Sequence, residues 1–165
     1  MAIKYHNVHW LWLSLAVILL DQITKQLVHI NLELYETLRL LPVLNLTHMR
    51  NTGAAFSALS SASPLFFIAL GVVVSIGILW WLRLHPRGET LVAIGLSLIQ
   101  GGALGNVIDR AYRGYVVDFV DFHIGECSWC HWPAFNVADS AIVIGAGLLV
   151  LDMFRKSEVT KSRSA

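Results

Sequence analysis

The run Val-Ala-Asp-Ser-Ala-Ile-Val-Ile-Gly-Ala-Gly-Leu-Leu-Val-Leu-Asp-Met-Phe, residues 137–154, decides the class of fold. Apolar side chains fill most of it, and an α-helix needs roughly 20 such residues to cross a bilayer. Three more runs of this kind precede it, at residues 10–30, 64–84 and 90–108. The sequence therefore predicts an all-α membrane protein with four transmembrane helices.

The composition agrees with a membrane protein. The chain has 165 residues, of which 56% are hydrophobic and 14% charged, and its mean hydropathy is +0.62. Soluble domains carry about 25% charged residues. The four runs leave no room for a separate soluble domain, so we expect one polytopic domain over residues 1–165. A net charge of +1 offers no electrostatic surface for nucleic acid.

The positions of lysine and arginine indicate the orientation. Cytoplasmic loops of membrane proteins are enriched in these residues. With both termini in the cytoplasm, the inner segments hold seven of them: Lys4, Arg83, Arg87, Arg155, Lys156, Lys161 and Arg163. The outer segments, 31–63 and 109–135, then hold four: Arg39, Arg50, Arg110 and Arg113. This bias predicts that the two outer segments are extracytoplasmic.

Two aspartates lie where a membrane-spanning helix is expected to begin or end. Asp118 closes the run Gly-Tyr-Val-Val-Asp, and Asp139 precedes the apolar residues 141–151. An ionisable group at a membrane boundary is costly and usually marks a functional site. Two carboxyl groups that meet can share one proton, as in aspartic-type hydrolysis. Each also has a structural interpretation: Asp118 as a surface-loop carboxylate, and Asp139 as a first-turn residue that interacts with the helix dipole.

Several shorter patterns add local structure. Asp21 and Lys25 are one helical turn apart and are expected to pair on a face turned toward protein. Residues 38–48 alternate apolar and polar side chains and contain a proline, which suits an edge strand at the membrane surface. Residues 51–53, Asn-Thr-Gly, are typical of a turn. Gly101 and Gly105 form a small-xxx-small pair of the kind that packs helices closely.

Close helix packing does not account for the polar residues nearby. Asn106 and Arg110 follow Gly102 at intervals of four residues. Asn136, Asp139 and Ser140, spaced i, i+3 and i+4, likewise lie on one face at the beginning of the last apolar run. Polar side chains in such positions need polar partners, so together they predict a polar pocket at one end of the helix bundle.

Five blocks of sequence resemble the lipoprotein signal peptidase (signal peptidase II) family, and they occur in the family's order. They are Asp21-Gln-Ile-Thr-Lys25, Asn51-Thr-Gly-Ala-Ala-Phe56, Gly101-Gly-Ala-Leu-Gly-Asn-Val-Ile-Asp-Arg110, Val116-Val-Asp-Phe119 and Phe135-Asn-Val-Ala-Asp-Ser140. One block would be weak evidence, whereas five in order cover nearly the whole chain.

The resemblance implies an aspartic endopeptidase of the bacterial inner membrane. Its substrates would be prolipoproteins whose cysteine carries diacylglycerol, cut on the N-terminal side of that cysteine, and globomycin would inhibit it. The implied fold adds a small extracytoplasmic β-sheet cradle to the four helices. No cofactor is implied.

The resemblance also implies roles for particular residues. Asp118 and Asp139 look like a catalytic dyad at the periplasmic face, which the lipid substrate would reach from the membrane. Asp21 and Lys25 look like structural supports. Residues that hold the substrate backbone or orient the dyad would be Asn51, Asn106, Arg110 and Asn136. For Arg110, stabilisation of developing negative charge stays open beside simple neutralisation of Asp109 or of a lipid phosphate.

One segment departs from the family's pattern. His123, Cys127, Cys130 and His131 fall within nine residues and are ligand types that zinc uses. An extracytoplasmic location also permits a disulfide. Free thiols, a disulfide and a metal site stay open, and we expect no metal in the catalytic mechanism.

Other functions remain as alternatives. A proton pathway would use Asp21, Lys25 and Asp139 as an intramembrane relay, and a non-enzymatic assembly factor would use the glycine faces. A serine mechanism would need a histidine of the outer segments to reach Ser140. We also expect the two outer segments to cover the dyad and to move when substrate enters.

Overall fold

The computed structural model describes residues 7–53, 63–84, 88–125, 127 and 130–164, with side chains as far as Lys156. A single 3-10 turn, Val8–Trp10, precedes the first helix. The helices are α1 (Leu11–Asn31), α2 (Pro64–Leu84), α3 (Thr90–Arg113) and α4 (Val137–Ser164). The strands are β1 (Thr37–Leu41), β2 (Leu44–Asn51) and β3 (Val116–Phe122).

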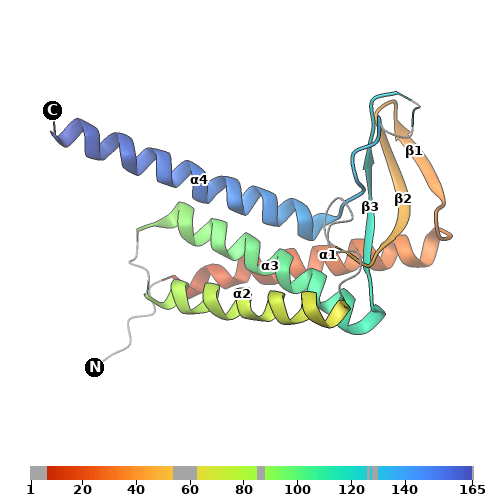
Figure 1. Ribbon diagram of the computed structural model, residues 1–165, viewed down its shortest axis with the longest axis horizontal. Helices are drawn as coiled ribbons and strands as arrows, with labels where there is room; N and C mark the ends of the chain where they lie inside the picture. The colour runs from red at the N-terminus through yellow and green to blue at the C-terminus, as the bar shows by residue number, and fades with distance from the viewer. Residues whose placement is uncertain (1–6, 54–62, 85–87, 126, 128–129, 165) are drawn as a thin grey trace.

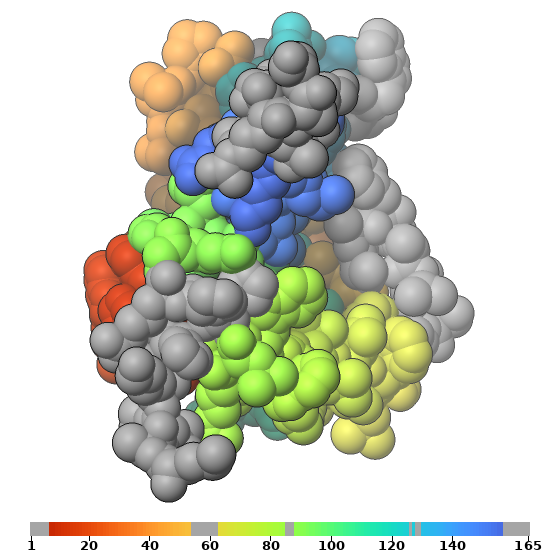
Figure 2. Space-filling model, turned by 90° about the vertical axis from the view of Figure 1, so that its left-hand side faces the viewer, coloured from red at the N-terminus to blue at the C-terminus, as the bar shows by residue number. Residues whose placement is uncertain are grey.

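The four helices lie side by side and the sheet lies across one end of them (Figure 1). Helix α3 packs against each of the other three helices. Seen from the end opposite the sheet, α3 lies between α4 and α2, with α1 at the edge (Figure 2). Residues of α3 therefore contact all three of the other helices.

Glycines permit this close packing. A Cβ at Gly101 would lie 2.8 Å from the backbone oxygen of Ser14 in α1. A Cβ at Gly105 would lie 2.6 Å from the Asp21 carboxylate. The interpretation of this pair as a helix-packing motif is confirmed, and Gly102 plays the same part against α4.

Apolar side chains cover the outside of the bundle, and its buried charged side chains lie inside. All four are long and apolar enough to cross a membrane. On α1, Leu15 and Ile23 are exposed, whereas Asp21 and Lys25 are fully buried. This distribution matches a lipid environment, in which polar groups must find partners inside the protein. The predicted fold class, four membrane helices with a small sheet, is confirmed.

The sheet is antiparallel in the order β1-β2-β3. Residues 38–48, predicted as one edge strand, instead form most of a hairpin, in which β1 is the edge and β2 the centre. Pro42 lies in the connection, because a residue without an N–H cannot take part in the ladder. Asn51 is the last residue of β2, and the predicted turn follows it directly, since its side-chain Oδ1 accepts the Gly53 N–H.

Strand β3 places Asp118 opposite Met49 of β2. The aspartate therefore lies within a strand, not at a helix boundary or in a surface loop. Residues 116–119 are all buried, and Val117 and Phe119 join Val28 and Leu32 in a hydrophobic cluster at the end of α1. This cluster fixes β3 against the bundle.

Two helices extend beyond the apolar runs that predicted them. Helix α3 continues past residue 108 to Arg113, so that Asp109 and Arg110 lie on the helix and not in an outer segment. It ends at Gly114, whose φ of 79° allows its N–H to bond to the Arg110 oxygen. Helix α4 continues past residue 154 to Ser164. Charged side chains end the hydrophobic pattern without ending a helix.

Candidate active site

Asn136 contacts both candidate catalytic carboxyl groups. Its side-chain Nδ2 donates to Asp118 Oδ1 at 2.7 Å, and its backbone N–H donates to Asp139 Oδ2 at 3.2 Å. The Asp139 N–H returns a hydrogen bond to Asn136 Oδ1 at 2.9 Å. This reciprocal pair is a capping box at the beginning of α4. Because one residue bonds to both carboxyl groups, the cap brings them together, and Asn136 itself is fully buried.

A second asparagine amide donates to each carboxyl group. Asn51 Nδ2 donates to Asp118 Oδ2 at 2.9 Å, and Asn106 Nδ2 donates to Asp139 Oδ1 at 2.8 Å. The opposite end of each amide is also occupied. Asn51 Oδ1 accepts the Gly53 N–H at 3.0 Å. Each amide can therefore present only its N–H side to the carboxyl group.

A buried lysine supports the second of these amides. Lys25 Nζ donates to Asn106 Oδ1 at 2.8 Å and forms ion pairs with Asp21 at 2.9 Å and Asp109 at 3.3 Å. All three charged side chains are fully buried. The predicted Asp21–Lys25 pair is confirmed, and Lys25 extends its contacts to α3.

Each carboxylate of this network also holds a backbone amide. Asp21 Oδ1 accepts the N–H of Ala138 at 2.9 Å, and Asp109 Oδ2 accepts the N–H of Val117 at 3.1 Å. Ala138 directly precedes Asp139, and Val117 directly precedes Asp118. The buried charges therefore position the backbone immediately before each candidate catalytic residue.

The proton affinity of Asp118 suits a shared proton. Burial, and then the charge of Asp139, raise the pKa of Asp118 from 3.8 to about 7, against the lowering effect of hydrogen bonds from Asn51 and Asn136. Asp118 is only 2% exposed. Two interacting carboxyl groups in such a site cannot both ionise cheaply, so a raised pKa of Asp118 is what a shared proton would require.

Arg110 lies beside the carboxyl groups. Its Nη2 donates to the Gly53 carbonyl at 2.7 Å, and its guanidinium lies 4.7 Å from the centre of the Phe67 ring. Within the described residues it forms no ion pair with Asp109, which is instead surrounded by Lys25, Arg113, Gln22 and the Val117 N–H. Lys25 and Arg113 are therefore the direct ion-pair partners of Asp109, which favours the other two roles for Arg110.

The sequence prediction missed part of this site. Asp109 appeared only as a neighbour of Arg110, although it is fully buried and holds β3. Gln22, which donates to the Gly105 carbonyl at 3.1 Å, was also missed. The spacing of Asp109 and Arg113, one helical turn apart, was the available signal. The predicted polar residues of α1, β2, α3 and α4 are all brought to the sheet end of the bundle.

Of the three states that the sequence left open for Cys127 and Cys130, namely free thiols, a disulfide or a metal site, the structure shows the disulfide. Cys127 and Cys130 are joined by a disulfide, with their Cα atoms 5.1 Å apart. Among the described residues, no three or more side chains gather as metal ligands. Ser140 Oγ donates to the Asn136 carbonyl. Among the residues that the structure describes, no histidine bonds to Ser140.

Comparison with known proteins identifies the family. The family model described as signal peptidase (SPase) II matches residues 13–155. A lipoprotein signal peptidase of Alteromonas mediterranea is 47% identical over 155 residues, 92% of this chain and 84% of its own. One of Coxiella burnetii is 51% identical over 147 residues, 87% of this chain and 88% of its own.

Solved structures agree. A bacterial membrane enzyme determined by the in meso method at 2.3 Å resolution superimposes with a TM-score of 0.83 and 30% identity, over 95% of this chain and 94% of its own. A second, determined at 1.9 Å resolution, gives a TM-score of 0.78 at 29% identity, over 93% and 97% of the two chains. With four membrane-spanning helices and this agreement in sequence and structure, the chain belongs to the signal peptidase II family of membrane peptidases.

Proposed function

We propose that this protein removes signal peptides from diacylglyceryl-modified prolipoproteins, using Asp118 and Asp139 as an aspartic dyad. The observation that carries the proposal is the double contact of Asn136, which binds both carboxyl groups at 2.7 and 3.2 Å. The substrate class rests on the family match and on relatives that are lipoprotein signal peptidases.

In the proposed reaction the dyad holds one proton and one water molecule. The ionised carboxylate takes a proton from the water, whose oxygen attacks the scissile carbonyl carbon. The protonated carboxyl group gives its proton to the carbonyl oxygen. When the tetrahedral intermediate breaks its C–N bond, a proton passes to the departing amine of the lipidated cysteine. The pKa of about 7 for Asp118 allows this exchange near neutral pH.

The asparagines would hold the two carboxyl groups in their relative orientation or bind the substrate backbone. Asn51 and Asn106 each fix one carboxyl group from outside the pair, so the two groups are held from three elements. We assign Asp21 and Lys25 a supporting role, because they contact the dyad only through Asn106 and the Ala138 amide.

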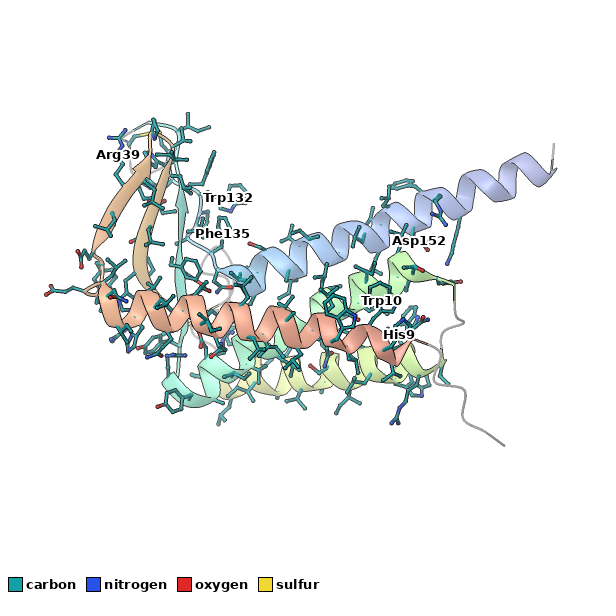
Figure 3. The ribbon with its side chains drawn as sticks, turned by 180° about the vertical axis from the view of Figure 1, so that it is seen from behind. His9, Trp10, Arg39, Trp132, Phe135 and Asp152 are labelled. Atoms are coloured by element: carbon teal, nitrogen blue, oxygen red, sulfur yellow. A yellow bond between two sulfur atoms is a disulfide. The ribbon has the colours of Figure 1, made fainter. Side chains whose placement is uncertain are left out.

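The location of the site fits a lipid-modified substrate. The dyad lies where α4 begins, between the bundle and the sheet, next to the apolar outer surfaces of the helices. In Figure 3, Trp132 and Phe135 lie on the side of the sheet that faces the helices, near the beginning of α4. The diacylglyceryl chains would stay in the bilayer while the peptide enters laterally. We propose that this end faces the periplasm of an inner-membrane protein.

Part of the predicted cover over the dyad lies outside the described residues, at 54–62. We keep the proposal that the outer segments move to admit substrate. Equal activity after an engineered crosslink that locks the outer segments 31–63 and 109–135 together would contradict it.

The two remaining roles of Arg110 are separable by kinetics. A role at the developing oxyanion is electrostatic transition-state stabilisation, so Arg110→Gln would lower kcat. A role at a lipid phosphate would chiefly raise KM for the lipidated substrate. The stacking of Arg110 on Phe67 is compatible with both.

The test uses purified protein and a diacylglyceryl-modified precursor, with release of the signal peptide as the readout. Asp118→Asn and Asp139→Asn are each expected to lower the rate by at least about 10²–10⁴-fold, the usual effect of removing a general acid or base, and globomycin should block the wild-type reaction. Asp152→Asn is the matched control, since this carboxylate lies at the opposite end of the bundle (Figure 3). Full activity in either dyad variant would remove that residue from the mechanism.

The arrangement argues against a proton relay. A relay needs ionisable groups at successive depths of the membrane. Asp21, Lys25 and Asp109 instead gather next to the dyad, and Asp152 pairs with Lys156 far from them.

A further inference from the structure

The sheet carries a cavity that the proposed mechanism does not use. Its volume is about 340 Å³, within the range of about 300–1,000 Å³ that ligand sites in proteins occupy. The described residues that line it all belong to the sheet or to the connections before β1 and after β3. They include Tyr35, Thr37, Thr47, Met49, Asp121 and His131. The cavity is therefore a feature of the sheet and not of the helix bundle.

One end of the cavity lies next to the candidate catalytic carboxyl groups. Met49, in its wall, is the direct partner of Asp118 in the antiparallel pair of β2 and β3. Side chains of directly opposite residues share one face of a sheet, with their Cβ atoms about 4.5–5.5 Å apart. Asp121, also in the wall, follows Asp118 by three residues on β3, which is roughly 10 Å along a strand. The cavity therefore extends from the neighbourhood of the dyad along the sheet.

The imidazole of His131 is fixed at this cavity with one nitrogen open. Its Nδ1 lies 2.8 and 3.0 Å from the two carboxylate oxygens of Asp121, and Asn45 Nδ2 donates to the same carboxylate at 2.9 Å. Its ring stacks on that of His123, with 4.9 Å between the ring centres and 16° between the planes. Carboxylate oxygens only accept, so Nδ1 carries the proton and Nε2 presents a lone pair. No described residue bonds to this Nε2, which leaves it available to a ligand.

Two threonine hydroxyls supply a second open acceptor. Thr47 Oγ1 donates to the Glu36 carbonyl at 3.2 Å and lies 3.0 Å from Thr37 Oγ1. A hydroxyl group has one hydrogen, so Thr37 donates to Thr47 and keeps its own lone pairs for another donor. Asp121 adds the charge of a carboxylate that is buried in the wall. A ligand with N–H or O–H donors therefore suits this cavity better than a ligand with a carboxylate.

The backbone at the cavity is strained. Tyr35 has a φ of 69°, the only positive φ among the non-glycine residues that the structure describes. Bulky residues seldom adopt this left-handed region, and such strain gathers at binding and catalytic sites. The His48 carbonyl holds Tyr35 in place by accepting its N–H at 2.9 Å. The strain is a separate observation that marks the cavity as a ligand site.

We propose that this cavity binds the beginning of the mature lipoprotein, and that it favours hydrogen-bond donors over carboxylates at the second to fourth residues, the lipidated cysteine being the first. This inference rests on the proposed function. The apolar signal segment and the diacylglyceryl chains belong in the bilayer beside the helices, so the sheet is left for the polypeptide on the other side of the scissile bond. An extended chain advances about 3.3 Å per residue and so reaches Asp121 and His131 about three residues after the cut.

The test compares two diacylglyceryl-modified precursors that differ only at these three residues, with serine in one and aspartate in the other. The wild-type protein should cleave the serine precursor with a kcat/KM about 2–10-fold higher, the effect of a single hydrogen bond, and the difference should lie mainly in KM. Asp121→Asn removes the repelling charge and Thr37→Val removes an acceptor, so each should bring the ratio of the two kcat/KM values closer to one. His131→Phe keeps the ring and loses Nε2, and it should raise KM for the serine precursor.

Thr90→Val and His9→Phe are the matched controls. Thr90 begins α3, and the exposed His9 lies at the same end of the bundle, opposite the sheet (Figure 3). Both variants should leave the ratio unchanged. A partly unfolded variant loses activity on both precursors alike, so the ratio reports on the cavity alone.

The outcomes separate this inference from the proposed function. Equal kcat/KM values for the two precursors in the wild type would overturn the inference and leave the proposed function intact. A wild-type ratio in both Asp121→Asn and Thr37→Val would do the same. If the wild-type protein cleaved neither precursor, the proposed function would fail, and this inference with it.

Discussion

Asp118 determines the pH range over which the candidate site holds its proton. Burial and the nearby charge of Asp139 both disfavour its ionised form, and together they raise its pKa to about 7. In the proposed mechanism the dyad needs one proton, which Asp118 would lose as the pH rises through this value. We therefore expect the rate of precursor cleavage to fall above a pH of about 7. A rate that stays constant to pH 9 would contradict a protonated partner in the dyad.

The same residue provides a direct test of the coupling between the two carboxyl groups. Asp139→Asn removes the second-largest cause of the raised pKa and leaves burial, the largest, in place. The pKa of Asp118 should therefore fall below about 7. Carboxyl ¹³C chemical shifts of labelled protein, followed over pH, would measure it without need of activity. Asp152→Asn should leave the value unchanged, and an unchanged value in Asp139→Asn would show that the two groups do not interact.

Individual residues also show how far sequence reasoning reaches. The five blocks located Asp118, Asp139 and the three asparagines, because each lies in a motif that keeps its order along the chain. Asp109 lies within one of these blocks, yet its role depends on Lys25, 84 positions away, and on the Val117 amide. No local pattern specifies those partners, so the buried network emerges only from the fold.

At the scale of elements, the beginning of α4 and the beginning of β3 are held by one ion network. Lys25→Met would leave the carboxylates of Asp21 and Asp109 buried without a counter-charge. Removing one partner of a buried ion pair costs about 3–5 kcal/mol, so the free energy of unfolding should fall by that amount, and activity should fall with it. Denaturant unfolding in detergent micelles would measure the loss.

Lys156→Met is the control for this network. Lys156 pairs with Glu89 and Asp152, but its side chain is 53% exposed. Exposed pairs contribute up to about 1 kcal/mol, so a small change is expected. If the two lysine variants lowered stability equally, the argument for a dyad-positioning network would fail.

The glycines of α3 give a second prediction about elements. A Cβ at Gly102 would overlap the Ala138 carbonyl and lie 2.8 Å from Ile142 Cγ1. Gly102→Ala should therefore push α4 away from α3, stretch the bond between Asn106 and Asp139, and cost about 1–3 kcal/mol, as overpacking does. Gly77→Ala on α2 meets nothing within 4 Å and should be neutral or stabilising. Cleavage rates and melting temperatures of the two variants would compare them, and an intact Gly102→Ala enzyme would contradict this account.

The elements themselves were predictable to different degrees. The four helices follow from runs of apolar residues, which need no knowledge of the rest of the chain. The strands do not follow in this way: β2 and β3 pair residues as distant as Leu44 and Phe122, and the three-stranded sheet was expected only from the family resemblance. The ends of α3 and α4 were missed because paired charges such as Asp109 and Arg113 stop the hydrophobic pattern before the helix stops.

At the scale of the whole molecule, the two ends of the bundle differ in composition. The sheet and the dyad occupy one end, and the last turn of α2 and the first turn of α3 lie at the other (Figure 1). Trp12, Trp80 and Trp81 are all exposed at that second end, as aromatic residues are at a membrane interface. Arg83 and Arg155 lie there as well, so the excess of positive charge predicts that this end faces the cytoplasm.

Cysteine labelling would decide this orientation. The chain has two cysteines, and the Cys127→Ser/Cys130→Ser protein gives a background without thiols. Arg39→Cys, at the far end of the sheet (Figure 3), should react with a membrane-impermeant maleimide in intact spheroplasts. Arg155→Cys, near the opposite end of α4, should react only after the membrane is permeabilised. The reverse pattern would place the dyad on the cytoplasmic side, where a signal peptidase of exported lipoproteins would not meet its cleavage site, and would overturn the proposed location together with the lateral route of substrate entry.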